Sequence, residues 1–244
     1  MKYVLILGAG SDIARPLSKL YAQGGYGVYL ASRNMEKLAR DAEDLKIRYN
    51  VDVTALKFDV TEIQTHQSFY NSLPIKPVGV VCIAGYLGSQ EIAENNFSES
   101  LRIISVNFTG CVSILNIIAD DFEHRHEGFI VGVSSVAGER GRKKNYIYGA
   151  AKSGFTTYLS GLRNRLYSSN VHVLTVHPGF VETKMTAGLP LPGLMTAQPE
   201  EVARDIFQAQ QSEKDFLYSK WIWRYIMVVI RAIPEFVFKK LSIG

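Results

Sequence analysis

The chain has 244 residues, and 47% of them are apolar, which suits one α/β domain with a large core and excludes a disordered chain. The formal net charge of +4 is mildly basic, but no dense block of Lys and Arg with interleaved aromatic residues indicates a nucleic-acid-binding protein. Two cysteines, Cys82 and Cys111, give neither a disulfide framework nor the spacing of a metal site. They predict two reduced core thiols in a cytoplasmic protein.

Short apolar runs rich in Val and Ile alternate with helical patterns, as expected for strands buried on both faces of a parallel sheet. The predicted strands are Tyr3–Leu7, Gly27–Ala31, Val53–Phe58, Val78–Ile83, Phe129–Val133, Val171–Val176 and Phe216–Tyr218. The predicted helices are Ile13–Gln23, Glu36–Arg48, about 98–122, about 147–167 and one after Pro199. The alternation predicts an α/β fold: a single doubly wound, Rossmann-type parallel sheet of about seven strands with helices on both faces.

We expect one domain over residues 1–219, with residues 220–244 as a helical C-terminal extension of it. The N-terminal Met-Lys is followed directly by a strand-like run, which is not the pattern of a signal peptide. No uninterrupted apolar stretch approaches the roughly 20 residues of a membrane-spanning helix.

The stretch LGAGSDIARP (7–16) follows the first predicted strand, at the edge of the sheet where ligands bind in such folds. Backbone N–H groups and a helix N-terminus attract phosphate there, so the stretch is a candidate dinucleotide-binding turn. Gly8 allows a positive φ, and Ala14 is small enough to let the helix approach the sheet. Asp12 stands where the wider glycine pattern has a glycine, and we expect it to cap the first helical turn. With Gly10 outside that pattern, the turn alone is weak evidence.

The second predicted strand ends in Leu-Ala-Ser-Arg-Asn at residues 30–34. An NAD-binding site usually has a carboxylate here, whereas Ser32 is neutral and does not repel a 2′-phosphate. Arg33 can donate two hydrogen bonds to that phosphate, which favours NADPH over NADH. The alternative is a solvated arginine at the start of a helix.

Residues 131–154 read VGVSSVAGERGRKKNYIYGAAKSG and contain the strongest catalytic pattern. Tyr148 and Lys152 are four apart and share one face of a helix, and Ser135 lies at a strand end. A free tyrosine hydroxyl, with a pKa of about 10, is a poor base near neutrality, but a nearby ammonium group favours its phenolate. Tyr148 can then exchange a proton with a carbonyl oxygen that Ser135 polarises. Tyr146 has no lysine four positions on, so we do not expect it to be the acid.

With Asn107 in SVNFTG and with HPGFVET at 177–183, these residues resemble the Asn-Ser-Tyr-Lys tetrad of the short-chain dehydrogenases/reductases, over the whole chain. The resemblance implies that Lys152 also holds the nicotinamide ribose, that Asn107 binds a water linking Lys152 to solvent, and that Thr183 holds the carboxamide.

The resemblance also implies that Asp59 bonds the adenine amino group, and that Ala84 and Gly85 leave room for the cofactor although Ile83 replaces the family's asparagine. The implied catalytic residues are Asn107, Ser135, Tyr148 and Lys152, with no metal. The implied cofactor-binding residues are Gly8, Ser11, Asp12, Ile13, Arg33, Asp59, Val60, Ala84, Gly85, Tyr148, Lys152, Pro178, Gly179 and Thr183.

The segment between Ser135 and Tyr148 is basic, with Arg140, Arg142, Lys143 and Lys144 beside Glu139. Near a substrate mouth it would suit an anionic substrate; otherwise it is a solvated loop.

The tail from Lys220 is aromatic and basic. We expect its charged residues (Lys220, Arg224, Arg231, Glu235 and Lys239) on one helical stripe, with Pro234 kinking or breaking the helix. The opposite apolar face suits an anionic membrane surface or another subunit.

Together these features are similar to the decaprenylphosphoryl-2-keto-erythro-pentofuranose reductase subgroup. That similarity implies NADPH-dependent reduction of a 2-keto sugar on a polyprenyl phosphate, the second half of a C2 epimerisation after a flavoprotein oxidase partner. It also implies cell-envelope biosynthesis and peripheral contact with the inner membrane face; we expect a homodimer or homotetramer. Residues 187–196 are a candidate apolar lid. The alternatives are a reductase of another lipophilic ketone, such as 3-ketosphinganine or a steroid, and a non-catalytic NADPH-binding regulator.

Overall fold

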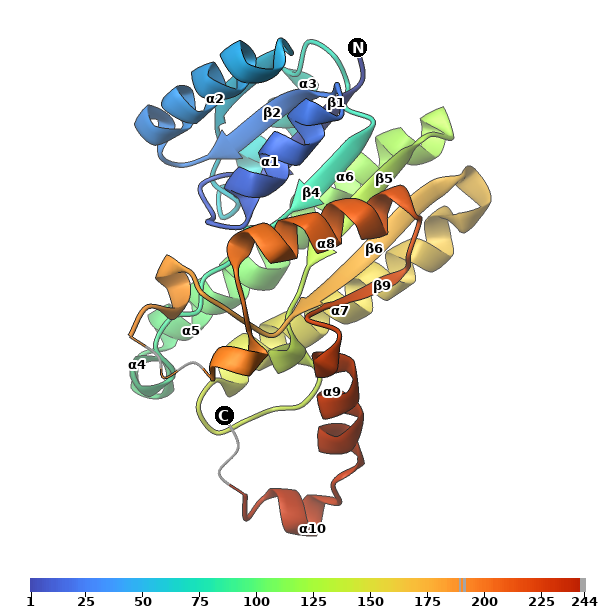
Figure 1. Ribbon diagram of the computed structural model, residues 1–244. Helices are drawn as coiled ribbons and strands as arrows, with labels where there is room; N and C mark the ends of the chain where they lie inside the picture. The colour runs from blue at the N-terminus through green and yellow to red at the C-terminus, as the bar shows by residue number, and fades with distance from the viewer. Residues whose placement is uncertain (189, 191, 242–244) are drawn as a thin grey trace.

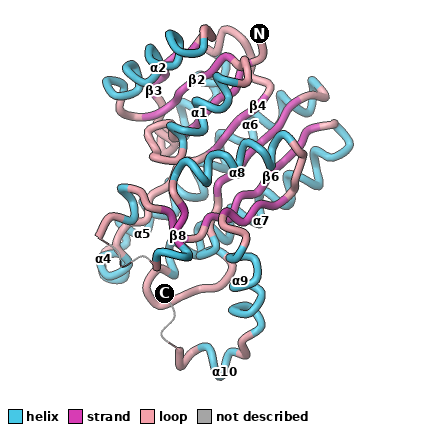
Figure 2. The backbone as a smooth tube through the Cα atoms, viewed as in Figure 1, coloured by secondary structure: helices cyan, strands magenta, loops and turns pink. Residues whose placement is uncertain are grey.

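The computed structural model describes residues 1–188, 190 and 192–241. Seven parallel strands form one sheet in the order β3-β2-β1-β4-β5-β6-β9 (Figures 1 and 2). Their bounds are β1 Tyr3–Leu7, β2 Gly27–Ser32, β3 Val53–Lys57, β4 Gly79–Cys82, β5 Gly128–Val133, β6 Val171–Pro178 and β9 Phe216–Ser219. The chain winds one way from β1 to β3 and the other way from β4 to β9. This reversal leaves a crevice at the carboxyl ends of β1 and β4.

Helices cover both faces of the sheet, as the alternating pattern predicts (Figure 1). One face carries α1 (Ala14–Gln23), α2 (Met35–Tyr49) and α8 (Pro199–Gln211), and the other carries α3 (His66–Asn71), α6 (Gly110–Arg125) and α7 (Tyr146–Leu166). Alternate residues of β1 belong to the two cores, because side chains of a strand point to opposite faces. Both Cys82 and Cys111 are buried and free.

The helix expected over 98–122 is two helices joined by a π-helical turn. α4 (Gln90–Asn95) precedes α5 (Phe97–Ile104), which passes through Ser105–Thr109 into α6. The continuous run Phe97–Arg125 is long and apolar enough to cross a membrane. Within this run, Ile114 and Ile118 of α6 are fully buried against the sheet, so α6 belongs to the core of the domain.

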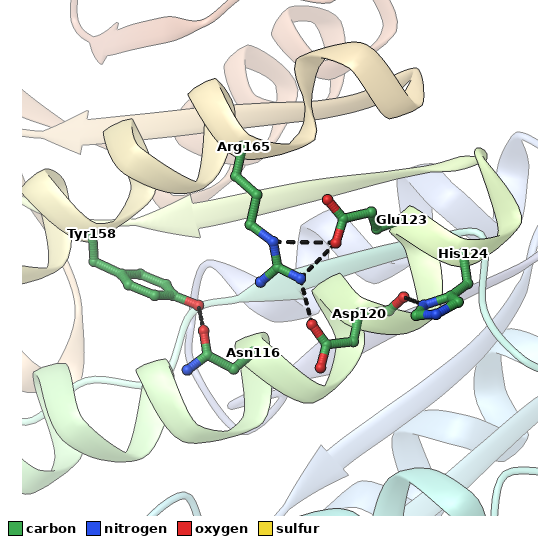
Figure 3. Close-up of polar contacts among 6 residues, drawn as sticks. All are labelled: Asn116, Asp120, Glu123, His124, Tyr158 and Arg165. Carbon is green, nitrogen blue, oxygen red and sulfur yellow. Dashed lines mark hydrogen bonds and ion pairs between the residues drawn. The ribbon is translucent and has the colours of Figure 1, made fainter.

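Polar side chains join α6 to α7 along their outer edge (Figure 3). Arg165 of α7 donates to Glu123 of α6 at 2.6 Å, and the Tyr158 hydroxyl donates to Asn116 Oδ1 at 2.8 Å. Because Asn107 lies just before α6 and Lys152 lies on α7, these contacts help to fix the relative position of two expected catalytic residues.

The C-terminal extension folds back against the domain rather than forming one long helix. α9 (Ile222–Ala232) ends before Pro234, and α10 (Glu235–Phe238) follows it, so the expected single charged stripe is wrong while the expected break at Pro234 is confirmed. Trp223, Met227 and Ile230 recur at helical spacing and are buried together with Val136 in a small separate cluster. Residues 242–244 of the extension lie outside the described residues.

Candidate active site

A cleft of about 530 Å³ opens at the carboxyl ends of the strands. Of the residues expected to bind cofactor or to catalyse, all line it except Asn107, which is fully buried behind it. The cleft also contains residues for which the sequence patterns give no specific role: Gly10, Leu87, Val136, Phe180, Met185, Thr186 and Trp223.

The first turn has the conformation expected for close approach to a phosphate. Gly8 has a φ of +88°, and a Cβ added there would lie 2.6 Å from the backbone nitrogen of Ala84. No other residue type fits, because both the backbone angle and the neighbouring strand exclude a side chain. The backbone N–H groups of Gly8 and Ala9 donate to the Ala31 carbonyl, which ties the turn to β2.

Asp12 does not cap α1, so that expectation is wrong. The helix begins after Ile13 without a side-chain cap, and Asp12 Oδ2 instead accepts a hydrogen bond of 2.8 Å from the backbone N–H of Lys184. The Lys184 ammonium lies 4.0 Å from Asp12 Oδ1. Asp12 therefore joins the first turn to the segment after β7 (Phe180–Val181), across the cleft.

The end of β2 and the end of β3 meet at the edge of the cleft. Arg33 lines the cleft beside Ser32, and a Cβ on Gly10 would lie 3.3 Å from Ser32 Oγ. Asp59 accepts two hydrogen bonds from Thr61, at 2.9 and 2.8 Å. Burial alone would raise the pKa of Asp59, but these bonds and the nearby Arg33 charge hold it below its ordinary value. The edge therefore presents an anionic and a cationic group together.

The turn that carries Ser135 packs directly on the helix that carries Tyr148 and Lys152. A Cβ on Gly149 would lie 2.8 Å from the Ala137 carbonyl oxygen, and one on Gly138 would lie 2.8 Å from the Lys152 backbone. Two glycines thus allow the backbones to touch. Ser135 Oγ accepts from Ala137 N at 3.1 Å, which fixes the hydroxyl at the start of the turn.

Lys152 is buried beneath the cleft, with 3% of its surface exposed. Its Nζ donates to the Val133 carbonyl at 3.0 Å and lies 5.8 Å from the centre of the Tyr148 ring. Ser134 supports the same helix by donating to the Lys152 carbonyl at 3.0 Å. The ammonium is therefore held at the end of β5, close to Tyr148. Tyr146 is exposed and is not among the residues that line the cleft, as expected.

Asn107 lies in the π-helical turn, a feature that often marks functional sites. Its Nδ2 donates to the carbonyls of Tyr86 at 2.6 Å and Ile103 at 2.8 Å, and its Oδ1 accepts from Tyr86 N at 3.2 Å. A Cβ on Gly85 would lie 3.4 Å from Asn107 Oδ1 and 3.8 Å from Lys152 Nζ. Asn107 thus holds the segment after β4, where Ile83 replaces the family's asparagine.

The far wall of the cleft is formed by the segment after β6 and by the C-terminal extension. A Cβ on Gly179 would lie 1.8 Å from Trp223 Nε1, which donates to the Met195 carbonyl at 3.0 Å. The Thr183 hydroxyl faces Thr186 Oγ1 at 3.2 Å. In the sequence, the helical spacing of Trp223, Met227 and Ile230 is the signal that could have indicated a side of the extension packed against the domain.

The basic segment 139–144 divides between three environments. Arg140 donates to the carbonyls of Ile230 and Ile233 and so holds the end of α9. Arg142 lines the cleft, whereas Lys143 and Lys144 are exposed and are not among its lining residues. One part of the segment, Arg142, therefore lines the cleft, and another part, Lys143 and Lys144, is a solvated loop.

The candidate lid over 187–196 is described only in part. Leu189 and Leu191 lie outside the described residues. The described part ends in β8 (Thr196–Ala197), which pairs with β7, and none of it lines the cleft. Met185 and Thr186, just before it, do line the cleft.

Comparison with known proteins agrees with this geometry. Residues 2–191 match the family model described as short chain dehydrogenase. The chain belongs to the short-chain dehydrogenase family. It is an NAD(P)-dependent oxidoreductase of this family, with the Rossmann-type fold of its members.

The relatives in the family match three quarters of the chain or more. An uncharacterised oxidoreductase of Mycobacterium tuberculosis is 33% identical over 241 residues, which cover 98% of this chain and 96% of the relative. The NADP-dependent 3-hydroxy acid dehydrogenase of Schizosaccharomyces pombe is 26% identical over 190 residues, 76% of this chain and 73% of the relative. A short-chain dehydrogenase from Sphingobium yanoikuyae, solved in complex with NADPH, has a TM-score of 0.82 at 20% identity, covering 96% of this chain and 97% of that structure.

Proposed function

We propose that the protein is an NADPH-dependent reductase that converts a keto group into a secondary alcohol. The observation that carries this proposal is the packing of the Ser135 turn on α7, which brings Ser135, Tyr148 and buried Lys152 to one cleft. Bound nicotinamide supplies the hydride in this family's chemistry. Ser135 polarises the carbonyl oxygen, and Tyr148 donates the proton to it.

The 2′-phosphate site that we propose consists of Arg33 with Ser32. Arg33 is exposed and lines the cleft, so it can reach a phosphate without the cost of leaving a buried position. Gly8 and the N-terminal end of α1 provide the pyrophosphate site. The Schizosaccharomyces pombe relative is named as an NADP-dependent enzyme, which supports a preference for NADPH over NADH.

For the substrate, we propose a 2-keto sugar carried on a polyprenyl phosphate, supplied by a flavoprotein oxidase in cell-envelope biosynthesis. Apolar side chains such as Val136, Phe180 and Trp223 line the substrate end of the cleft, and Arg142 adds a positive charge among them. An amphiphilic anion matches this combination better than a small neutral ketone does. Another lipophilic ketone, such as 3-ketosphinganine or a steroid, is the second candidate, because the same apolar lining favours it.

We propose cytoplasmic location with peripheral contact at the membrane. The outer side of α9 exposes Trp221, Tyr225, Val228 and Val229, opposite the buried side of the same helix. Arg224 and Arg231 lie along one edge of this apolar stripe, and basic residues beside an apolar face are typical of helices at anionic membrane surfaces. A homodimer or homotetramer that covers the stripe is the competing arrangement.

A lipid extract tests the substrate class without prior choice of a ketone. The extract is treated with a flavoprotein oxidase and then with this enzyme and NADPH, and mass spectrometry follows ketones that gain two hydrogens. The proposal predicts consumption of an anionic, lipid-linked keto sugar. Reduction of neutral keto-lipids alone would favour the second candidate, and binding of NADPH without any reduction would favour a regulator.

A further inference from the structure

Arg142 is a buried cation in the wall of the cleft. Only 7% of its surface is exposed, yet it lines the cleft together with Tyr148 and Trp223. Its guanidinium group donates to Met227 Sδ at 3.3 Å, a weak acceptor, and its Nε has no hydrogen-bond partner among the described residues. Arginine has five N–H donors, so this side chain has bonding capacity left for a ligand.

Asn145 adds a second unsatisfied polar atom beside Arg142. The Asn145 backbone N–H donates to the Arg142 carbonyl at 3.1 Å, so one turn carries both residues. Asn145 also lines the cleft, and its Oδ1 is buried without a partner among the described residues. A buried donor and a buried acceptor in one wall cost free energy unless a ligand or water bonds them.

The charges around Arg142 leave the cluster net positive. Glu139 is buried, and Arg231 Nε approaches its Oε2 at 3.5 Å from α9. His177 lies 3.7 Å from Glu139 Oε1, and burial lowers the pKa of His177 to about 4, so it is neutral near pH 7. One carboxylate therefore faces two guanidinium groups, those of Arg142 and Arg231.

The other basic residues of the segment do not line the cleft. Arg140 bonds carbonyls at the end of α9 and pairs with Glu235 at 2.9 Å. Lys143 and Lys144 are exposed and are not part of the cleft wall. Of the four basic side chains between Ser135 and Tyr148, Arg142 is thus the one that lines the cleft.

We propose that Arg142, with Asn145 beside it, binds an anionic group of the ketone substrate, a phosphate ester or a carboxylate, and so determines which ketones enter. The guanidinium donates to the anionic oxygens, and Asn145 Oδ1 accepts from a substrate hydroxyl. This inference rests on the proposed function, because it takes the cleft beside Tyr148 to be the substrate site.

Calorimetric titration of the enzyme–NADP⁺ complex tests the inference without turnover. The probes are geranyl phosphate, geranic acid and geraniol, which share one chain and differ in the head group. The wild type should bind at least one of the two anions about tenfold or more tightly than geraniol, since hydrogen bonds to charged groups are among the strongest. The two anions together distinguish a phosphate site from a carboxylate site.

Arg142→Met should remove this preference while leaving the affinities for geraniol and NADP⁺ unchanged. Lys143→Gln, which removes an exposed charge from the same segment, should retain it. If Arg142→Met fails to bind NADP⁺, Arg142→Lys is used in its place. It keeps the positive charge but has fewer donors, so it should lose part of the preference for the anions over geraniol. An Arg142 variant with wild-type preference, or a wild type that binds geraniol as tightly as both anions, would overturn the inference. Failure of the proposed reduction would appear separately, as absent turnover with intact anion binding.

Discussion

At the scale of single residues, Asp12 replaces a glycine of the turn pattern and makes a contact to a distant segment instead of capping α1. Its carboxylate lies in the turn that we propose as the pyrophosphate site, where a negative charge is unfavourable for the cofactor. In return it accepts the Lys184 N–H and holds the segment that contains Thr183 near the cleft. The two residues are 172 positions apart, so no local pattern could reveal the contact.

Replacing Asp12 separates these two effects. Asp12→Ala removes the acceptor, and the freed segment should raise the KM for NADPH by about three- to tenfold, the effect of one lost charge-assisted hydrogen bond that is partly exposed to solvent. Asp12→Asn keeps an acceptor oxygen and removes the charge, so its KM should equal or fall below that of the wild type. Steady-state kinetics checks both variants. Equal losses in the two variants would mean that the negative charge itself is required.

At the same scale, the proposed preference for NADPH depends on Arg33. Arg33→Ala should weaken NADPH binding by about tenfold or more, because a hydrogen-bonded charge contributes roughly 1.5–3 kcal/mol, and should leave NADH binding nearly unchanged. Fluorescence titration with both cofactors measures the difference. Equal weakening of NADPH and NADH would remove the proposed contact with the 2′-phosphate.

At the scale of elements, backbone contacts through glycine bring the catalytic groups together. Gly149 of α7 lies against the Ala137 carbonyl in the turn that carries Ser135. Any side chain there would separate the turn from the helix and so move Ser135 relative to Tyr148. The proposed arrangement of Ser135 and Tyr148 therefore depends on this close packing as well as on the two side chains.

Two glycine substitutions in the same helix test this dependence. Gly149→Ala should lower kcat by about tenfold or more and destabilise the fold by about 1–3 kcal/mol, because its Cβ would meet a backbone atom. Gly161→Ala is the control, since nothing lies within 4 Å of its added Cβ. It should keep full activity and gain about 0.5–1 kcal/mol from helix propensity. Similar kcat values in both variants would contradict the packing argument.

Most of the elements could be predicted because their patterns are local. Buried Val- and Ile-rich strands such as β1 and helices such as α2 end within a few residues of the predicted bounds. The π-helical turn around Asn107 could not be foreseen, because a single turn of five residues is too short to show a periodic pattern of its own. The inward packing of Trp223 depends on contact with Gly179, which lies far away in sequence.

At the scale of the whole molecule, the C-terminal extension joins the cleft to the outer surface. Trp223 forms part of the cleft wall, while Trp221 and Tyr225 of the same segment are exposed and stack edge-on at 5.8 Å. Figure 1 shows α9 and α10 beyond the end of the sheet. The membrane contact that we propose would therefore place the lipid surface next to the segment that lines the cleft.

Charged substitutions on the exposed stripe test the membrane contact. Trp221→Glu with Tyr225→Glu should reduce binding to vesicles of anionic phospholipid by about tenfold or more, through lost apolar burial and added repulsion. Tyr167→Glu, at an exposed aromatic residue elsewhere, should bind as the wild type does. Sedimentation with vesicles measures binding. If the double variant sediments with vesicles as the wild type does, the stripe is not the membrane contact. If the wild type does not bind vesicles and the double variant dissociates a dimer, the stripe is a subunit interface.

The central claim is that Tyr148 completes a hydride transfer from NADPH to a ketone in this cleft. Its most direct test is incubation of wild type and Tyr148→Phe with oxidised lipid extract and NADPH that carries two deuterium atoms at the nicotinamide C4. With the wild type, we predict a new alcohol with one deuterium on its carbinol carbon. With Tyr148→Phe, we predict at least about a hundredfold slower incorporation despite normal NADPH binding. Deuterium transfer at the wild-type rate in the variant, or none in the wild type, would contradict the account.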